Sequence, residues 1–240
     1  MRSGSPWQRV STAAVAGAAA VAILAPAASA APAVNGTPHA HASQAGTALP
    51  RQLTQDAYVA WLKKQHTDAA AATLKAFTKL SNLRKYIFLQ QLQNRSAYAA
   101  LQAQLKGGPK GFHKTVPYNK VISIARDVAI TKTRGKKPAT TVTFTVTQTI
   151  YNIPVTSHTV WATYQTAKGK QLKVTDSGAR VTNTNGAYAI KATSSGSTHT
   201  GATAQWHGAP RVASVGKAID KQQSVATSAS VSWKAGLTTN

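Results

Sequence analysis

Residues 140–151 alternate between apolar and hydroxyl-bearing side chains with a period of two. Thr occupies every odd position from Thr141 to Thr149, and the even positions between and beside them carry Val142, Phe144, Val146, Gln148 and Ile150. This period predicts a β-strand with one face in the core and the other toward water. Thr suits the outer face, because its β-branch packs on the pleat while its hydroxyl stays hydrated. We therefore interpret the threonine face as the solvent side of a long central strand.

Residues 53–105 show helical spacing instead. Leu53, Tyr58 and Leu62 fall on one helix face, and Thr67 followed by Asp68 is typical of a helix N-terminus. A third apolar run at helical spacing starts near Ser81 and continues to residue 105, before Gly107-Gly108-Pro109 ends the helical region. The pattern leaves open whether two or three helices form.

From residue 116 onward the period is again two, and turn residues separate the segments. The expected strands cover residues 118–132, 140–151, 156–166, 171–183, 187–193, 201–207 and 224–233. Helices followed by consecutive strands favour an α+β fold, in which N-terminal helices pack on a curved antiparallel sheet. We expect that domain to span residues 53–183, and residues 184–240 to form a β-rich or partly disordered tail.

The first thirty residues have the pattern of a secretory signal peptide. Arg2 and Arg9 precede and flank a short apolar stretch, and Ala28-Ser29-Ala30 is a small-residue cleavage site. Residues 31–52 are rich in Pro, Ala, Gly and Ser and are expected to form a flexible leader. The protein is therefore expected to be secreted, extracellular or associated with the cell wall, with no transmembrane segment in the mature chain.

The composition is strongly basic. The chain has 28 Lys and Arg residues against 5 acidic ones, a formal net charge of +23, and no Cys. Such a field attracts polyanions, and outside a cell these are anionic envelope polymers or acidic proteins. Nucleic acid is a less favoured partner, because the aromatic residues that stack on single-stranded bases are sparse near the basic clusters. A high charge that only keeps a secreted protein soluble is the alternative.

Basic residues gather in the predicted hairpin turns. The two clusters consist of Lys132, Arg134, Lys136 and Lys137 in one hairpin, and of Lys168, Lys170 and Lys173 in the other. Alternate hairpin turns lie at the same end of an antiparallel sheet, so the two clusters are expected to form one polyanion-binding patch. A further run of Lys106, Lys110, Lys114 and Lys120 precedes the first predicted strand. Each cluster alone is also explained as a solvated sheet margin that blocks aggregation.

Two segments carry a resemblance to a known family, namely VPYNKVISIARDVAITKTRGKKPATTVTFTVTQTIYN and SHTVWATYQTAKGKQLKVTDSGA. Residues 53–178 resemble the NTF2-like or cystatin-like helix-plus-sheet region that precedes the amidase domain of certain secreted bacterial proteins. The shared landmarks include His158 at the head of a strand and Gly169, Leu172 and Asp176 near the close. The amidase domain is absent and the chain has no Cys, so the resemblance implies a scaffold and no reaction.

The resemblance also implies a pocket, because NTF2-like cones place an acid or a His at their mouth. The expected pocket residues are Tyr118, Asp127, Tyr151, His158, Tyr164 and Asp176. The alternative is that Asp127 and Asp176 only pair with surrounding Lys and Arg. No metal site and no cofactor are expected, since His residues are scattered and Glu is absent. Ser214 and Lys217 match a serine acyl-enzyme spacing without its companion motifs, which favours chance.

Three functional hypotheses follow. The first is a non-enzymatic cationic protein that associates with anionic cell-envelope or extracellular polymers through its lysine hairpins. The second is a small-ligand binder or hydrolase that uses the interior of an NTF2-like cone. The third is a Gln- and Lys-rich substrate or partner of an extracellular enzyme.

Overall fold

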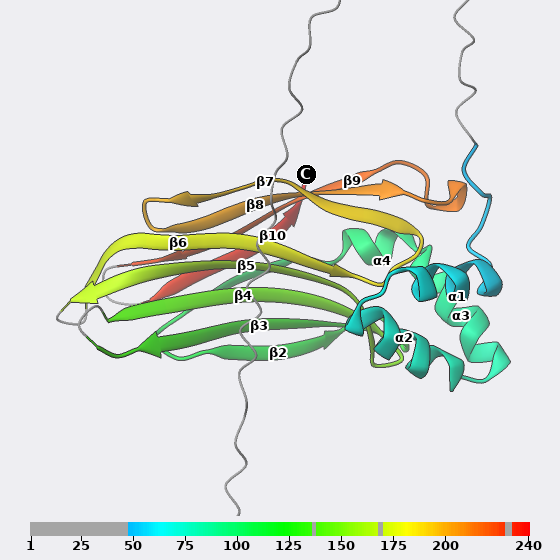
Figure 1. Ribbon diagram of the computed structural model, residues 1–240, viewed down its shortest axis with the longest axis horizontal. Coiled ribbons are helices and arrows are strands. Elements are labelled where there is room, and N and C mark those ends of the chain that lie inside the picture. The colour runs from blue at the N-terminus through cyan, green and yellow to red at the C-terminus, as the bar shows by residue number, and fades with distance from the viewer. Residues whose placement is uncertain (1–47, 136–137, 168–169, 229–231) are drawn as a thin grey trace, which may run out of the picture. The chain divides into compact units, whose positions relative to one another are not determined.

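The computed structural model describes residues 48–135, 138–167, 170–228 and 232–240, which belong to one compact unit. This part contains two antiparallel sheets of five strands each and a group of short helices (Figure 1). The helices are α1 (Gln55–Lys64), α2 (Asp68–Thr78), α3 (Asn82–Leu92), α4 (Arg95–Ala99) and the 3-10 helix η1 (Ala213–Val215).

Strands that follow one another in sequence are neighbours in the first sheet. Its order is β2 (Phe112–Pro117), β3 (Ile122–Thr133), β4 (Ala139–Ile150), β5 (Ile153–Ala167) and β6 (Lys170–Asn183). The second sheet has the order β1 (Ala103–Gly107), β10 (Trp233–Thr239), β9 (Ile219–Thr227), β8 (Gly201–Pro210) and β7 (Tyr188–Thr198). Pairing of β1 with β10 joins segments far apart in the sequence, with Ala103 opposite Leu237.

The two sheets pack face to face as a β-sandwich, and their inner faces form the core. On β4 the alternation predicted from sequence is confirmed, because Val142, Phe144 and Val146 are fully buried while the threonines between them are only half-buried. On β8 of the opposite sheet, Trp206 is buried, and its ring centroid lies 5.0 Å from that of His158 on β5. Side chains of both sheets therefore fill the space between them.

The outer threonines of β4 bond to hydroxyls of the neighbouring strand. The Oγ1 atoms of Thr141 and Thr163 lie 2.8 Å apart, and Thr147 Oγ1 lies 2.8 Å from Ser157 Oγ. These hydroxyls satisfy one another across β4 and β5, so the threonine face stabilises the sheet through cross-strand bonds that the prediction of a solvent-facing side did not include.

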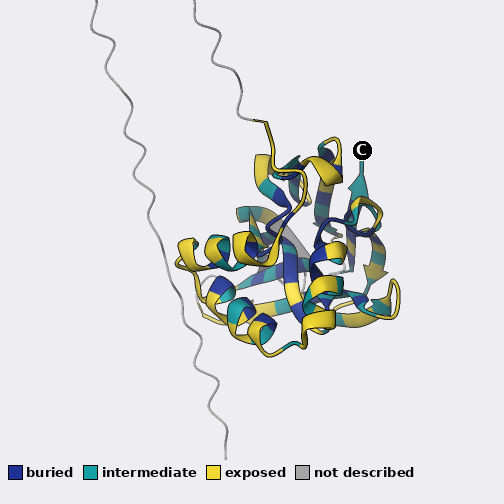
Figure 2. Ribbon diagram, turned by 90° about the vertical axis from the view of Figure 1, so that its right-hand side faces the viewer, coloured by how far each residue is buried: buried dark blue, intermediate teal, exposed yellow. Residues whose placement is uncertain are grey.

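The helices lie together at one end of the sandwich (Figure 1). Asp68 begins α2, and Thr67 caps it by accepting a hydrogen bond from the Ala70 amide, which confirms the predicted helix start. Tyr58, Phe77 and Phe88 form an aromatic cluster with ring centroids 5.2–5.9 Å apart. Seen from this end, the buried residues of the helices face inward and the exposed ones face outward (Figure 2).

The predicted fold class is wrong. Strands β1 and β7–β10 form a second full sheet, and this sheet covers the inner face of β2–β6 where the α+β prediction placed helices. The helices are too short for that role, since 11 residues of α2 span only about 16 Å, whereas the 15-residue β5 extends over about 50 Å. Residues 184–240, expected as a tail, supply four of the five strands of the second sheet.

Several element boundaries also differ from the sequence prediction. The third helical run ends at residue 99, and residues 103–107, expected to be helical, form β1. The strand predicted over residues 224–233 is two strands, β9 and β10, in the described part of the chain. The end of the predicted leader is bonded to the domain, because Pro50 and Arg51 accept hydrogen bonds from the amides of Ala213 and Ser214. The predicted signal peptide and residues 31–47 lie outside the described residues.

Candidate functional site

The strand ends that β3 shares with β4 and β5 shares with β6 lie at the end of the sandwich opposite the helices (Figure 1). We call this region the hairpin end and define it by Lys132, Arg134 and Lys173. All three side chains are exposed. The register places Thr133 opposite Ala139, Ala139 opposite Gln165, and Gln165 opposite Lys173, so one row of paired residues runs across the sheet from the first basic hairpin to the second. Three strand spacings separate its ends, about 14 Å.

The remaining residues of the predicted patch are not described. Lys136, Lys137 and Lys168 lie outside the described residues, as does the side chain of Lys170 in β6. The hairpin end therefore rests on Lys132, Arg134 and Lys173.

A lysine pair on the second sheet was missed by the sequence analysis. Lys106 on β1 lies directly opposite Lys234 on β10, and both side chains are exposed. Like charges placed directly opposite each other destabilise a sheet. The two lysines border a groove of about 530 Å³, whose wall includes Ser224, Ala226 and the side-chain-free Gly236. No local pattern points to this pair, because β1 and β10 lie more than 120 residues apart and meet only through strand pairing.

In the described ranges, no carboxylate forms an ion pair with these cations. The ion pairs among the described residues are His113–Asp127 and His207–Asp220, and neither involves Lys or Arg. Asp176 accepts a hydrogen bond from Trp161 Nε1 at 3.2 Å, while Asp56 and Asp68 lie in the first turns of α1 and α2. Within the described residues, Asp127 and Asp176 therefore have His113 and Trp161 as partners rather than Lys or Arg. The positive field of the domain is left for a partner or for solvent ions.

The six residues of the expected pocket do not come together. His158 and Tyr164 are buried between the sheets, whereas Asp127 and Asp176 lie on the outer face of the first sheet, paired with His113 and Trp161. The other two are turn residues. Tyr118 is exposed in the β2–β3 turn, and Tyr151 in the β4–β5 turn lies under the Arg84 guanidinium. Because these residues occupy both faces of one sheet, a single cavity cannot hold them all.

A buried polar cluster surrounds His158. Tyr98 Oη lies 3.4 Å from His158 Nε2, and Lys221 Nζ lies 5.1 Å from the centre of the Tyr98 ring. Lys221 donates hydrogen bonds to the carbonyls of Ala99 and Leu101 and to Thr239 Oγ1, at 2.8–3.1 Å. Burial lowers the pKa of Lys221 to about 7, and burial together with the Lys221 charge lowers the pKa of His158 to about 3. These groups are fully buried, so the cluster serves the core.

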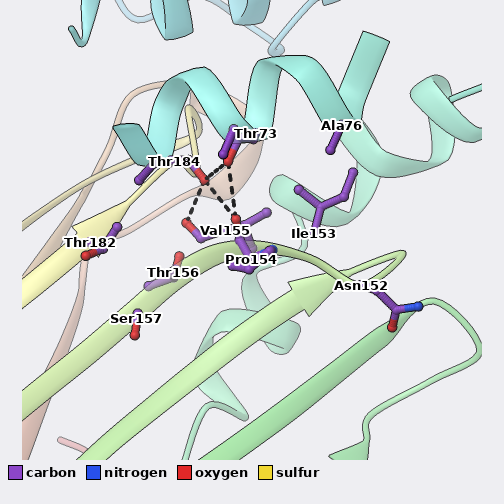
Figure 3. A pocket seen from close by; sticks show the side chains of 12 residues that line it. Thr73, Ala76, Asn152, Ile153, Pro154, Val155, Thr156, Ser157, Thr182 and Thr184 are labelled. Carbon is purple, nitrogen blue, oxygen red and sulfur yellow. Dashed lines mark hydrogen bonds between the residues drawn. The ribbon is translucent and has the colours of Figure 1, made fainter. Parts of the chain in front are cut away.

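A mostly apolar cavity of about 360 Å³ lies between α2 and β5 (Figure 3). Alanines of α2 form one wall, and Ile153, Pro154 and Val155 form the opposite one. Thr73 and Thr184 lie at one side of it and satisfy each other and the Pro154 carbonyl (Figure 3). Thr73, Thr184 and Ser157 are already bonded and the cavity has no charged side chain in its wall, so it offers few groups that could orient a ligand.

Metal binding and membrane crossing are not indicated in the described part of the chain. No group of three or more His or Asp side chains there could hold a metal ion. None of the helices described has both the length and the apolar character needed to cross a bilayer.

Comparison of the chain with protein-family models, curated proteins and solved structures finds no match. The resemblance of residues 53–178 to NTF2-like regions therefore stays a prediction.

Proposed function

We propose that the protein is a secreted cationic protein that associates with anionic cell-envelope or extracellular polymers through its hairpin end. The observation that supports this most is that none of the Lys and Arg residues in the described ranges forms an ion pair with a carboxylate. A net charge of +23 destabilises the folded state through self-repulsion, and ion pairs with carboxylates would reduce that repulsion.

The arrangement of the cations supports a polymer rather than a small ligand. Lys132, Arg134 and Lys173 are exposed at one end of the first sheet, and the strand register spreads them over about 14 Å. Lys106 and Lys234 form a second cationic position on the other sheet and keep an unfavourable like-charge contact. A polymer with regularly spaced anionic groups can contact both the hairpin end and the Lys106–Lys234 pair. Each contact is favourable because it neutralises a cation and releases counterions.

Salt-dependent retention on heparin and on an anionic cell-wall fraction tests this proposal. The variant Lys132→Gln, Arg134→Gln, Lys173→Gln is expected to elute at clearly lower salt than the unmodified protein. A matched control, Lys63→Gln, Lys64→Gln, Lys79→Gln, removes the same three charges from exposed positions at the helix end. It should elute close to the unmodified protein. Equal shifts for the two variants would show that net charge alone causes retention, and the proposed site would be wrong.

A further inference from the structure

A cleft of about 700 Å³ lies between the helix end and the edges of both sheets. Its walls come from α1, the start of α2, β6, β7 and β8. Trp61, Arg211, Lys191 and His207 line it, together with the uncharged polar side chains of Gln65, Thr67, Thr182 and Asn183. None of the residues assigned to the hairpin end takes part, so this cleft is a separate site.

Among the described residues, no acceptor bonds the hydrogen-bond donors of the Arg211 side chain in this cleft. Its guanidinium carbon lies 5.2 Å from the centre of the Trp61 ring, and within the described ranges this guanidinium forms no ion pair. Arg211 Nε is buried without a hydrogen-bond acceptor, and so is Trp61 Nε1. A guanidinium offers five donors, and burying one without an acceptor costs free energy. Burial accordingly lowers the pKa of Arg211, although the group remains charged.

The position of Arg211 is fixed by its surroundings. Its backbone amide donates a hydrogen bond of 2.8 Å to the Ala187 carbonyl, directly after β8 ends. Other neighbours fix the Trp61 ring. Its centroid lies 6.0 Å from that of the stacked Tyr58 ring, and the indole packs against Gly186. A Cβ atom at Gly186 would lie 3.2 Å from Trp61 Cε3, so the glycine lets the indole lie close to the backbone. The indole thus presents a rigid platform for the guanidinium.

The charges that face Arg211 favour an anion. Lys191 on β7 lines the same cleft and is exposed without an ion pair. His207 on β8 already bonds Asp220, with 2.6 Å between Nδ1 and Oδ1, so that carboxylate is engaged. Asp68 at the start of α2 is the other acid near the cleft, and it lies on the side of α2 that faces a different depression with Lys63 and His66.

We infer that this cleft binds an anionic sugar, with a carboxylate or phosphate group held by the guanidinium of Arg211. A planar guanidinium stacked on an aromatic ring matches the two oxygens of such a group. Thr182 and Gln65 supply a hydroxyl and an amide oxygen that suit a polyhydroxylated ligand, whereas the Asn183 amide is bonded to Tyr188 and Asn185 and the Thr67 hydroxyl caps α2. A cleft of about 700 Å³ has room for one or two sugar units. This inference is independent of the proposed polymer binding at the hairpin end.

Titration calorimetry with the full chain tests the inference, with D-glucuronate, glucose 6-phosphate and uncharged glucose as probes. At least one anionic sugar is expected to bind, and glucose is expected to bind at least tenfold more weakly. Arg211→Gln should weaken anion binding by about tenfold or more, since a charged hydrogen bond is lost. Arg211→Lys should lie between the two, because it keeps the charge and loses the planar fork. The anion that binds more tightly identifies the group that the cleft prefers.

Two controls keep the result interpretable. Thermal unfolding shows whether Arg211→Gln is folded, and if it is not, Lys191→Gln at the exposed rim replaces it, with a smaller expected loss of anion affinity. The hairpin-end variant should bind the sugars as the unmodified protein does, and Arg211→Gln should keep its heparin retention. Equal affinity for glucose and the anions, or unchanged affinity in both cleft variants, would overturn the inference without affecting the proposed function.

Discussion

Gln223 on β9 donates a hydrogen bond of 3.1 Å from Nε2 to the backbone carbonyl of Phe144 in the opposite sheet. The same amide group donates to the His158 carbonyl, and its Oε1 accepts from Trp206 Nε1 at 3.0 Å. One buried side chain therefore bonds both sheets at the centre of the core.

Replacing Gln223 by Met should destabilise the protein by about 2–4 kcal/mol, because the Trp206 indole and two carbonyls lose their buried partner. Urea unfolding followed by circular dichroism measures the effect. Gln222→Met is the matched control, since Gln222 is the exposed neighbour on the same strand. Similar losses in the two variants would contradict the bridging role of Gln223.

The ionisation of Lys221 should make stability rise with pH above neutrality. Its folded-state pKa of about 7 lies below the usual value of 10.5, so between these values the unfolded chain binds the additional proton. The free energy of unfolding is then expected to increase by at least about 1 kcal/mol from pH 7 to pH 9.5. Urea unfolding at several pH values measures this slope. In Lys221→Met the slope should disappear, and an unchanged slope would assign it to another group.

His158 should give an acid-dependent loss of stability. Its pKa of about 3 lies below the usual 6.5, so the unfolded chain is protonated first as the pH falls from 6.5 toward 3. Stability is therefore expected to fall between pH 7 and pH 4.5, before most carboxylates titrate. His158→Phe, of similar volume, should have a smaller dependence than the unmodified protein. The exposed His199→Phe is the control, and it should follow the unmodified curve.

Trp161 packs over Gly178 on the neighbouring strand, and a Cβ atom there would overlap the indole. Gly178→Ala is therefore expected to displace the ring, to break its hydrogen bond to Asp176 and to cost about 1–3 kcal/mol. Gly196 on β7 has open space around its Cα, so Gly196→Ala should be neutral or slightly stabilising. Equal unfolding midpoints for the two variants would refute the packing argument.

The variant Lys234→Glu is expected to change the stability of the protein and its retention on heparin in opposite directions. It converts the like-charge contact with Lys106 into an attractive one, which should stabilise the sheet by about 0.5 kcal/mol or more. Heparin retention should nevertheless fall further than in Lys64→Glu, which makes the same charge change at the helix end. Unfolding midpoints and elution salt measured on both variants decide this. Equal retention in the two would exclude the Lys106–Lys234 pair from the polymer contact.

Local patterns predicted local structure well. The alternation along β4 identified both faces of the central strand, and Thr67 marked the start of α2, because each depends on neighbours in sequence. The sheet that covers β4 could not be predicted in this way. On β9 the inward positions include Lys221 and Gln223, whose burial is compensated by partners more than 60 residues away, so the strand lacks a clear apolar period.

The candidate sites also differ in whether their residues are close together in the sequence. The exposure of Lys132, Arg134 and Lys173 at one end of the first sheet follows from their places beside the turns. The opposition of Lys106 and Lys234 depends on the register between β1 and β10, and the Arg211 cleft requires Trp61 to lie beside a residue 150 positions later. Neither contact has a local signature that a single sequence could reveal.

The pairing of β1 with β10 also sets a condition on folding. Ala103 on β1 pairs with the fully buried Leu237 on β10. The second sheet is therefore complete only when nearly the whole described chain is available. Contacts of such long sequence separation slow folding, because loop closure must precede them. Until then β1 has no partner strand, and the part of the core that Trp233, Ala235 and Leu237 of β10 cover stays exposed. Shortening the chain by its last strand should therefore leave β1 unpaired and expose apolar core side chains, which favours aggregation over a smaller stable protein.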